Sequence, residues 1–337
     1  MKNERLNELF DVKKTELDRY YQIKLLNLGL KFYFDEKKDL NCKFVGSEIN
    51  LKREGRTANE GDILTPDIIL QTREKNPIGF AIELKSSLSN TESTKEELLK
   101  MQRYNDNLIG WATENQKVRE HKIVFGPRFE DSGKVKEAFK QLTENKKIKL
   151  VKQFLIWDWA LTQSLKFQKK ETIILMQTSG ELLENDLKKL NARLKEGIEI
   201  DTTDVRISTS LESTKFTRKR PPVEYTMLEL WENILSRFCN YNNNYTTTVD
   251  KVTDFLNSFE SALMTNTDGN KFKIRKEWIE EAFDKLVEIE LAERKEHDLY
   301  YFKFDKYNIR NTVDYICRAT AKADIKKYRA KNQKKLK

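Results

Sequence analysis

The 337-residue chain is predicted to be an α/β protein, with a mixed sheet flanked by helices in its N-terminal part and a smaller α+β domain in its C-terminal part. Two observations predict this. Apolar segments rich in β-branched and aromatic residues alternate with amphipathic helical segments through the first part, which is typical of a sheet covered by helices. A basic segment with two prolines, 214–223, then precedes a pattern of three helices and a hairpin.

The elements follow in order. A long helix is predicted over about 4–26, and a short strand-like run over 30–34. Further strands are expected at 67–70, 78–85, 122–125, 153–159 and 172–176, and further helices at about 93–109, 134–145 and 181–195. The resulting domains are 1–213, a linker at 214–223, a second domain at 224–316 and a basic C-terminal tail at 317–337.

The segments 67–70 and 78–85 predict a β-hairpin, because the polar run between them ends in the turn-forming pair Asn76-Pro77. If the loop is centred on Lys75, Asp67 and Glu83 lie at equal distances from the centre and face each other. Directly opposite residues hold their Cβ atoms about 4.5–5.5 Å apart. The alternation of a strand places Glu83 and Lys85 on one face and leaves the opposite face for the core.

Two facing carboxylates repel each other unless a cation lies between them. Oxygen ligands of this kind suit Mg²⁺, which takes one or two carboxylates and leaves its other positions to water and substrate phosphate. Lys85 shares the face of Glu83 and would reach a scissile phosphate or the attacking water. The pattern predicts metal-assisted phosphodiester hydrolysis.

Pro66-Asp67 followed by Glu83-Leu84-Lys85 resembles the signature of the PD-(D/E)xK nuclease superfamily, over a span from the first helix to about Phe125. The resemblance implies a restriction-endonuclease-like fold, with Asp67, Glu83 and the Leu84 carbonyl as metal ligands and Lys85 as the catalytic lysine. It also implies Mg²⁺ as cofactor, with Mn²⁺ as a substitute. The alternative is an exposed Glu-x-Lys on an amphipathic strand, which is common in so charged a chain.

Other candidate site residues depend on the same resemblance. Gln102, with Tyr104 nearby, is similar to the Gln that members of the superfamily often carry on the helix after the Lys. A helix-edge polar residue explains Gln102 almost equally well. Glu16 on the first helix and Glu60 in the loop before the hairpin are candidate auxiliary acids, and solvated surface positions explain both.

The C-terminal pattern of three helices and a hairpin resembles a winged-helix module. The third helix of that family commonly enters the DNA major groove, but here it carries Glu277, Glu280, Glu281 and Asp284. DNA reading and binding of a protein partner therefore both remain open. The residues expected to contact nucleic acid are Arg218, Lys219, Arg220, Arg294, Lys295, Lys326, Lys327 and Arg329.

The net charge of +9 is concentrated in the segment 317–337, where nine Lys or Arg residues stand against Asp324 alone. Such a segment can neutralise phosphates, although most terminal Lys runs are simply solvated. Three distant cysteines without a Cys-x-x-Cys pair do not suit a disulfide framework or a zinc site, and two histidines give little support to His-based catalysis. No signal peptide or membrane span is expected, so the predicted location is cytoplasmic.

The predicted function is divalent-metal-dependent hydrolysis of DNA, with restriction, phage defence or a mobile element as roles by family analogy. Two alternatives stay open. One is a noncatalytic DNA-binding or regulatory protein that retains the nuclease fold. The other is a partner-activated nuclease directed at RNA. A homodimer would be the simplest way to cut a duplex.

Overall fold

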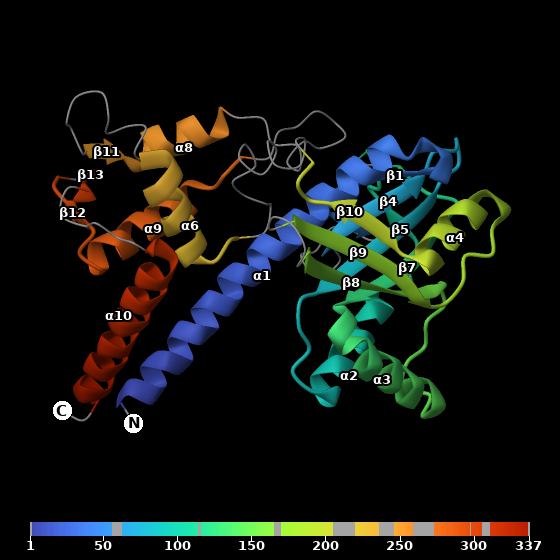
Figure 1. The fold of residues 1–337 in the computed structure, drawn as a ribbon, viewed down its shortest axis with the longest axis horizontal. Helices are drawn as coiled ribbons and strands as arrows, with labels where there is room; N and C mark the ends of the chain where they lie inside the picture. The colour runs from blue at the N-terminus through green and yellow to red at the C-terminus, as the bar shows by residue number, and fades with distance from the viewer. Residues whose placement is uncertain are drawn as a thin grey trace. The chain divides into compact units, whose positions relative to one another are not determined.

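A computed structural model describes residues 2–55, 63–113, 116–164, 170–204, 220–235, 246–258, 273–296, 298–304 and 311–335. The chain divides into two compact units. We call them the sheet unit, which comprises Gln22–Thr214 and Ser261–Phe272, and the helical unit, which comprises Met1–Tyr21, Lys215–Glu260 and Lys273–Lys337. Helix α1 (Lys2–Glu36) contributes to both units (Figure 1).

The sheet unit contains a seven-stranded mixed sheet, so the predicted mixed α/β architecture is confirmed. Its strand order is β1-β4-β5-β7-β8-β9-β10. The three central strands β5, β7 and β8 are parallel, and the outer strands pair antiparallel. Their bounds are β1 (Cys42–Ser47), β4 (Ile68–Thr72), β5 (Ile78–Lys85), β7 (Glu120–Pro127), β8 (Phe154–Ser164), β9 (Lys170–Ser179) and β10 (Ile198–Asp201).

A second, small sheet in the same unit has the order β3-β2-β6. Strand β2 pairs with β3, which precedes the β4–β5 hairpin, and with β6, which follows the next helix. This small sheet therefore connects the segments before and after that hairpin and helix. The bounds are β2 (Leu51–Arg53), β3 (Ile63–Leu64) and β6 (Leu108–Ile109).

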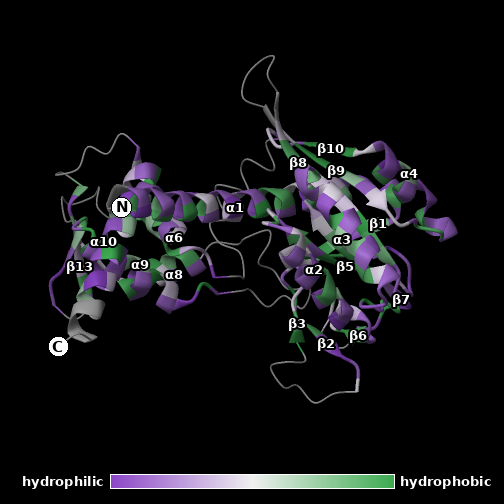
Figure 2. Ribbon diagram, turned by 90° about the horizontal axis from the view of Figure 1, so that it is seen from below, coloured by the Kyte–Doolittle hydropathy of each residue, from purple (hydrophilic) through white to green (hydrophobic). Residues whose placement is uncertain are grey.

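Helices cover both faces of the large sheet, and each face has its own hydrophobic core (Figure 1). One core joins the second half of α1 and α4 (Lys188–Glu196) to Phe80, Ile82 and Leu84 of β5. The other joins α2 (Thr91–Lys100) and α3 (Ser132–Glu144) to Ala81 of β5. The alternation predicted for β5 is therefore correct, and the face opposite Glu83 is core as expected; the Glu83 face is buried as well. Figure 2 shows the central strands coloured as hydrophobic and the covering helices in both colours.

Helix α1 continues to Glu36, so the strand expected at 30–34 is wrong. The C-terminal part of α1 is buried in the first of these two cores through Leu26, Leu28, Leu30 and Phe34. A helix buried on several sides loses its single apolar stripe, and its short apolar runs cannot be distinguished from a strand by periodicity alone.

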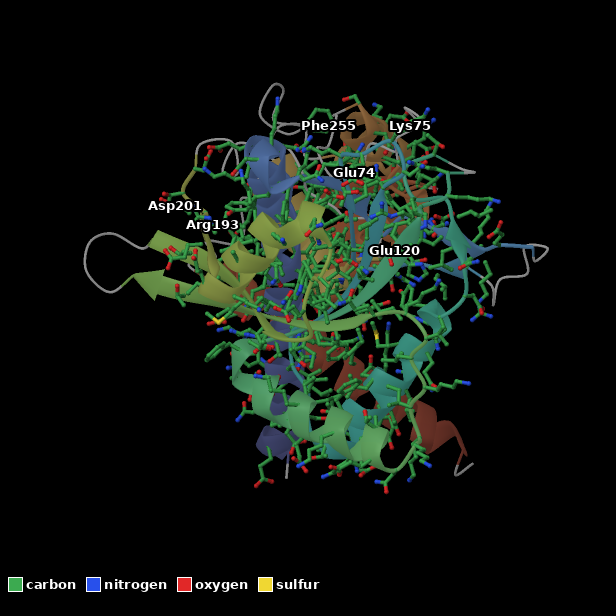
Figure 3. All side chains as sticks on the ribbon, turned by 90° about the vertical axis from the view of Figure 1, so that its right-hand side faces the viewer. Glu74, Lys75, Glu120, Arg193, Asp201 and Phe255 are labelled. Carbon is green, nitrogen blue, oxygen red and sulfur yellow. The ribbon has the colours of Figure 1, made fainter. Side chains whose placement is uncertain are left out.

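The turn between β4 and β5 lies at the same end of the sheet as the start of β7, because Ile78 pairs with Glu120. Figure 3 labels Glu74 and Lys75 in this turn and Glu120 at the start of β7. Asn41 donates to the Glu74 carboxylate at 2.8 Å, which ties the turn to the residue before β1. The polar turn is thus an anchored end of the hairpin, and Asp67 and Glu83 lie at the other end.

The helical unit contains the predicted succession of helices and hairpin. Phe283 of its third helix packs edge-on against Tyr300 and Phe302 of the hairpin. An unpredicted strand precedes the second helix and completes a three-stranded sheet of order β11-β13-β12. The bounds are α6 (Val223–Glu229) with a π-helical turn at Leu230–Ile234, β11 (Thr246–Thr248), α8 (Val249–Asn257), α9 (Lys276–Glu288), β12 (Ala292–Arg294) and β13 (Leu299–Phe302).

The basic segment expected as a tail at 317–337 begins inside helix α10 (Thr312–Lys335). Its residues Ile316, Cys317 and Ala321 are buried, so at least its first half is part of the folded unit. Lys13, in the first half of α1, forms ion pairs with Glu224 of α6 at 2.6 Å and with Asp324 of α10 at 2.8 Å. Residues 2–21 therefore group with this unit rather than with the expected domain 1–213.

Gly79→Ala is expected to lower the free energy of unfolding by about 1–3 kcal/mol, the usual cost of overpacking a core. A Cβ at Gly79 would lie less than 3.0 Å from three ring carbons of Trp111. That indole is fully buried and donates to Leu108 O at 2.9 Å, so it cannot easily move. Urea denaturation of the purified protein measures the change.

The matched control is Gly133→Ala in α3, where a Cβ would meet no heavy atom within 4 Å. This substitution is expected to be neutral or to stabilise the protein by about 0.4–1 kcal/mol, because it restricts the unfolded chain. An equal loss of stability in both variants would contradict the packing of Trp111 on β5.

Candidate active site

The hairpin register is as predicted. Ile68 pairs with Ile82 and Leu70 with Phe80, which places Asp67 opposite Glu83 at the open end of the hairpin. Both acidic residues are 5% exposed. Two carboxylates are therefore buried on neighbouring strands, an arrangement that costs free energy unless hydrogen bonds and cations compensate it.

The backbone holds the Asp67 carboxylate. The amide N–H of Leu84, the residue that follows Glu83, donates to Asp67 Oδ2 at 2.7 Å. This hydrogen bond crosses the hairpin and fixes one carboxylate oxygen beside the strand that carries Glu83. The two acids are thus positioned by the same pair of strands.

The Glu83 carboxylate is held by two residues of the short 3-10 helix η3 (Met101–Tyr104), which follows α2 directly. The Arg103 guanidinium and the Tyr104 hydroxyl both donate to Glu83 Oε1. Tyr104 is fully buried, and burial together with the charge of Glu83 raises its pKa, so the hydroxyl stays protonated and remains a donor.

The surroundings of Glu83 raise its pKa. Burial and the charge of Asp67 have that effect, and Arg103, Tyr104 and Lys85 act in the opposite direction without overcoming it. A metal ion bound beside Glu83 would favour its ionised form.

Lys85 lies on the Glu83 face of β5, as predicted, and is about one-quarter exposed. Its ammonium forms an ion pair at 2.6 Å with Glu97 of α2, and it is near enough to Glu83 to lower that group's pKa. Glu97 also pairs with Lys100, which is 58% exposed. Asp67, Glu83 and Lys85 are thus brought together, with Lys85 at the exposed margin.

Gln102 is not brought to the carboxylates. Its Oε1 accepts from the backbone N–H of Lys149 at 2.9 Å, and its Nε2 contacts Leu99 O. The predicted helix 93–109 ends at Lys100 and continues as a 3-10 turn, in which residues three apart align. Met101 and Tyr104 consequently share the buried side, and Gln102 turns away.

Helix α2 begins at Thr91, close to the predicted start at about 93. Asn90 is its N-cap and Ser93 the reciprocal partner. Arg103 was missed in the sequence because the α-helical period places it away from the site. The 3-10 end of α2 directs Arg103 towards Glu83, and no residue of the sequence signals that change of helix type.

The structure describes one of the two candidate auxiliary acids, and that residue does not contact the cluster. Glu16 is exposed on the part of α1 that belongs to the helical unit, and Glu60 lies outside the described residues. A different acid, Glu48, is 5% exposed and was missed. Its backbone N–H contacts the carbonyls of Pro66 and Asp67, and it adopts a positive φ of 55°. An acidic residue held in the left-handed region beside Asp67 is unusual enough to indicate a local role.

The described residues among those expected to contact nucleic acid fall into two groups. Four of them form ion pairs: Arg220 with Glu281, Arg294 with Asp284 and Asp298, Lys295 with Glu293, and Lys327 with Glu288. Lys326 and Arg329 are exposed on α10. Arg218 and Lys219 lie outside the described residues. Trp157 and Trp159 are buried in the sheet core and are not available to stack on bases.

Comparisons of the chain with protein-family models, curated proteins and solved structures find no match. Within the described residues, no group of three or more His, Cys, Asp and Glu side chains is arranged to hold a metal ion. Within that same part of the chain, no helix is long and apolar enough to cross a membrane. The case for a function depends on the site's own chemistry.

Lowering the pH from 7 to 5 is expected to cost about 2 kcal/mol of unfolding free energy through His121, which supports η3 by contacting Tyr104 O at 2.7 Å. Burial lowers the pKa of His121 from 6.5 to about 4. The unfolded chain therefore binds the proton first, and stability falls as the pH drops from about 6.5 towards 4. Urea denaturation at both pH values measures the loss.

His121→Gln is the matched variant, because its side-chain N–H can still donate to Tyr104 O while it cannot titrate. The difference between pH 7 and pH 5 should be about 2 kcal/mol smaller in this variant than in the wild type. Parallel pH dependences in the two proteins would contradict a neutral, buried His121.

Proposed function

We propose that the chain is a divalent-metal-dependent nuclease that hydrolyses DNA phosphodiester bonds at Asp67, Glu83 and Lys85. The observation that carries the proposal is the pair of carboxylates buried opposite each other on the hairpin, with a lysine on the same face as Glu83. The resemblance to the PD-(D/E)xK superfamily agrees with this arrangement. The mixed sheet flanked by helices agrees with it too. In the helical unit, the order of helices and hairpin resembles that of a winged-helix module.

The residues fit Mg²⁺ held by two carboxylates. Asp67 and Glu83 would be ligands together with the Leu84 carbonyl, and the absence of a third acidic or imidazole ligand among the described residues suits an ion that keeps several waters. When bound, the ion would polarise the phosphate and lower the pKa of a water. Mn²⁺ has similar ligand preferences and would substitute.

The chain's own residues would position the two carboxylates and neutralise the charge that develops during hydrolysis. The Leu84 N–H orients Asp67, and the Tyr104 hydroxyl orients Glu83. In hydrolysis a water oxygen bonds to phosphorus while the bond to the leaving oxygen breaks, and negative charge grows on the phosphoryl oxygens and the leaving oxygen. Lys85 would stabilise that charge, and its ion pair with Glu97 holds the flexible side chain at the margin of the site.

One observation favours a second candidate function. Arg103 already places a cation on Glu83, so the cluster could be a structural ion pair in a noncatalytic DNA-binding or regulatory protein. The two functions differ in whether Glu83 exchanges Arg103 for a metal ion. That exchange can be measured without a substrate.

Lys85→Ala is expected to lower Mg²⁺-dependent cleavage at least about 100-fold, the usual effect of removing a group that stabilises a transition-state charge. The assay incubates linear, circular and single-stranded DNA, and an RNA duplex, with Mg²⁺, Mn²⁺ or EDTA. DNA binding in EDTA should be unchanged, because Lys85 is proposed to act on the reacting phosphate.

Lys100→Ala is the control, since Lys100 pairs with the same Glu97 carboxylate but lies on the surface of α2. Its activity should stay within a factor of about 2 of wild type, because an exposed ion pair contributes about 0–1 kcal/mol. Equal activity of the Lys85 and Lys100 variants, or no cleavage of any substrate by the wild type, would count against the proposed function.

Arg103→Gln is expected to increase the affinity for Mg²⁺ in the absence of DNA, because the arginine and the metal ion compete for Glu83. Isothermal titration calorimetry measures the affinity, and Arg119→Gln serves as a control, since Arg119 pairs with Glu74 at the opposite end of the hairpin. If neither the wild type nor the Arg103 variant binds a divalent ion, Glu83 and Arg103 form a structural pair and the noncatalytic function is favoured.

A further inference from the structure

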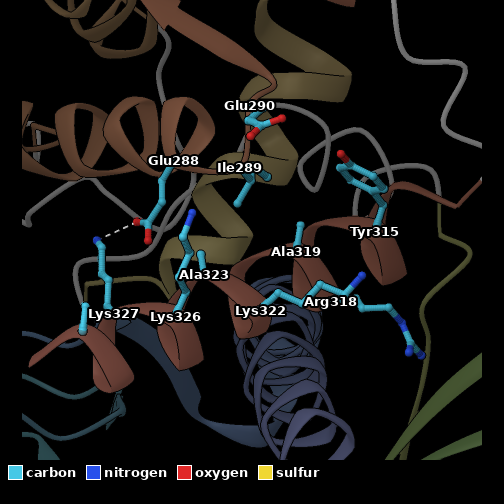
Figure 4. Close-up of a pocket in the computed structure, with 11 residues that line it drawn as sticks. Glu288, Ile289, Glu290, Tyr315, Arg318, Ala319, Lys322, Ala323, Lys326 and Lys327 are labelled. Atoms are coloured by element: carbon cyan, nitrogen blue, oxygen red, sulfur yellow. Dashed lines mark hydrogen bonds and ion pairs between the residues drawn. The ribbon is translucent and has the colours of Figure 1, made fainter. Parts of the chain in front are cut away.

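Helix α10 carries a groove on the side that faces the end of α9. The groove has a volume of about 620 Å³, and Figure 4 shows α10 along one wall and the last turn of α9 opposite. Alanines at 319, 323 and 330 form part of the α10 wall, and Ile289 contributes an apolar side chain from beyond α9. The small alanines leave the neighbouring long cationic side chains as the dominant features.

Four exposed cations follow the length of α10: Arg318, Lys322, Lys326 and Arg329. Their spacing of four, four and three residues places them on one side of a helix. At 1.5 Å per residue the row is about 16 Å long. The buried residues Ile316 and Thr320 lie on another side, so packing does not require the cations to be there. We call these four residues the basic ridge.

Two acids, Glu288 and Glu290, line the groove with the cations of the basic ridge, and Glu288 pairs with Lys285 and Lys327. In the described part of the chain, Lys322, Lys326 and Arg329 make no ion pair or hydrogen bond, and Arg318 stacks on the Phe10 ring. Like charges three or four residues apart destabilise a helix by about 0.2–0.5 kcal/mol per pair. The ridge contains three such pairs, and a bound polyanion would relieve their repulsion.

The surface that a winged-helix module would present to DNA is rich in acidic residues here. A groove along α9 is lined by Glu277, Glu280, Glu281 and Asp284. The wing cations are matched by acids, since Arg294 lies 3.8 Å from Asp284 and Lys295 lies 3.0 Å from Glu293. Glu293 also pairs with Lys303 at 2.7 Å. A phosphate at the wing would have to displace these carboxylates.

We infer that the basic ridge of α10 binds the phosphate backbone of a nucleic acid without reading its sequence, and that α9 and the wing do not enter its grooves. Lys and Arg side chains bind phosphate oxygens whatever the base sequence, and the spacing of these four along one side of a helix suits contact with successive phosphates. An anionic membrane fits less well, because interfacial helices bury Trp, Phe or Leu beside their cations, whereas the groove beside this ridge offers alanines.

This inference concerns binding on the helical unit and goes beyond the proposed hydrolysis at the hairpin. Measurements in EDTA separate the two. A chain that binds DNA through α10 but never cuts it would retain this inference and lose the proposed function, and a nuclease that binds elsewhere would do the reverse.

The test compares two double variants of the full-length protein that remove equal charge. Lys322→Gln with Lys326→Gln removes two ridge cations, and Arg294→Gln with Lys295→Gln removes two cations of the wing. Fluorescence anisotropy with a 20-base-pair duplex in EDTA gives Kd over a range of salt concentrations. Circular dichroism checks that both variants keep their helix content.

The ridge variant is expected to bind more weakly, with a salt dependence of log K against log salt that is shallower by about 2, since each neutralised phosphate contributes about 0.9. The wing variant should match the wild type. Equal losses in both variants would overturn the inference in favour of diffuse attraction by net charge. A loss confined to the wing variant, absence of duplex binding by the wild type, or stronger binding to phosphatidylserine vesicles than to DNA would each overturn it as well.

Discussion

The burial of two carboxylates on neighbouring strands is the constraint on which the sheet unit depends. Taking ionised groups out of water costs several kcal/mol each unless partners replace the solvent. Asp67 has the Leu84 N–H, and Glu83 has Tyr104 and Arg103. These last two partners come from the segment after β5, so that segment must turn back over the sheet immediately. Helix α2 is short and ends in a 3-10 turn at this point, and β6 then leads the chain away.

The sequence was sufficient to predict the hairpin and its register, because a period of two and a loop of definite length leave one way to pair Asp67 with Glu83. It was insufficient for Gln102 and Arg103, because their directions depend on a change from 3.6 to 3.0 residues per turn that no side chain announces. It also failed at 30–34, where a helix buried on several sides and a buried strand give the same pattern.

The sequence predicted where the excess positive charge lies, but not which cations are paired with acids, because that pairing depends on tertiary structure. The count of cations located the excess of positive charge near the C-terminus, and α10 indeed carries it. Which cations are available to a partner depends on acids brought close by the fold. Asp284 approaches Arg294 from another element of the unit, whereas Lys322 forms no ion pair with any described residue. Residues with identical chemistry in the sequence therefore differ in the charge that they present.

The hairpin site carries acidic side chains and the basic ridge of α10 carries cationic ones, so each lacks what the other provides. A pair of buried carboxylates creates a negative potential, which repels a polyanion until a metal ion is present. The hairpin site would then contribute chemistry but little of the affinity for nucleic acid, and the acidic groove of α9 would contribute none. A chain with such a site requires a cationic surface elsewhere, with charge that its own acids do not cancel. Among the described residues the basic ridge of α10 meets that requirement, because its repulsion is left unrelieved in the free protein.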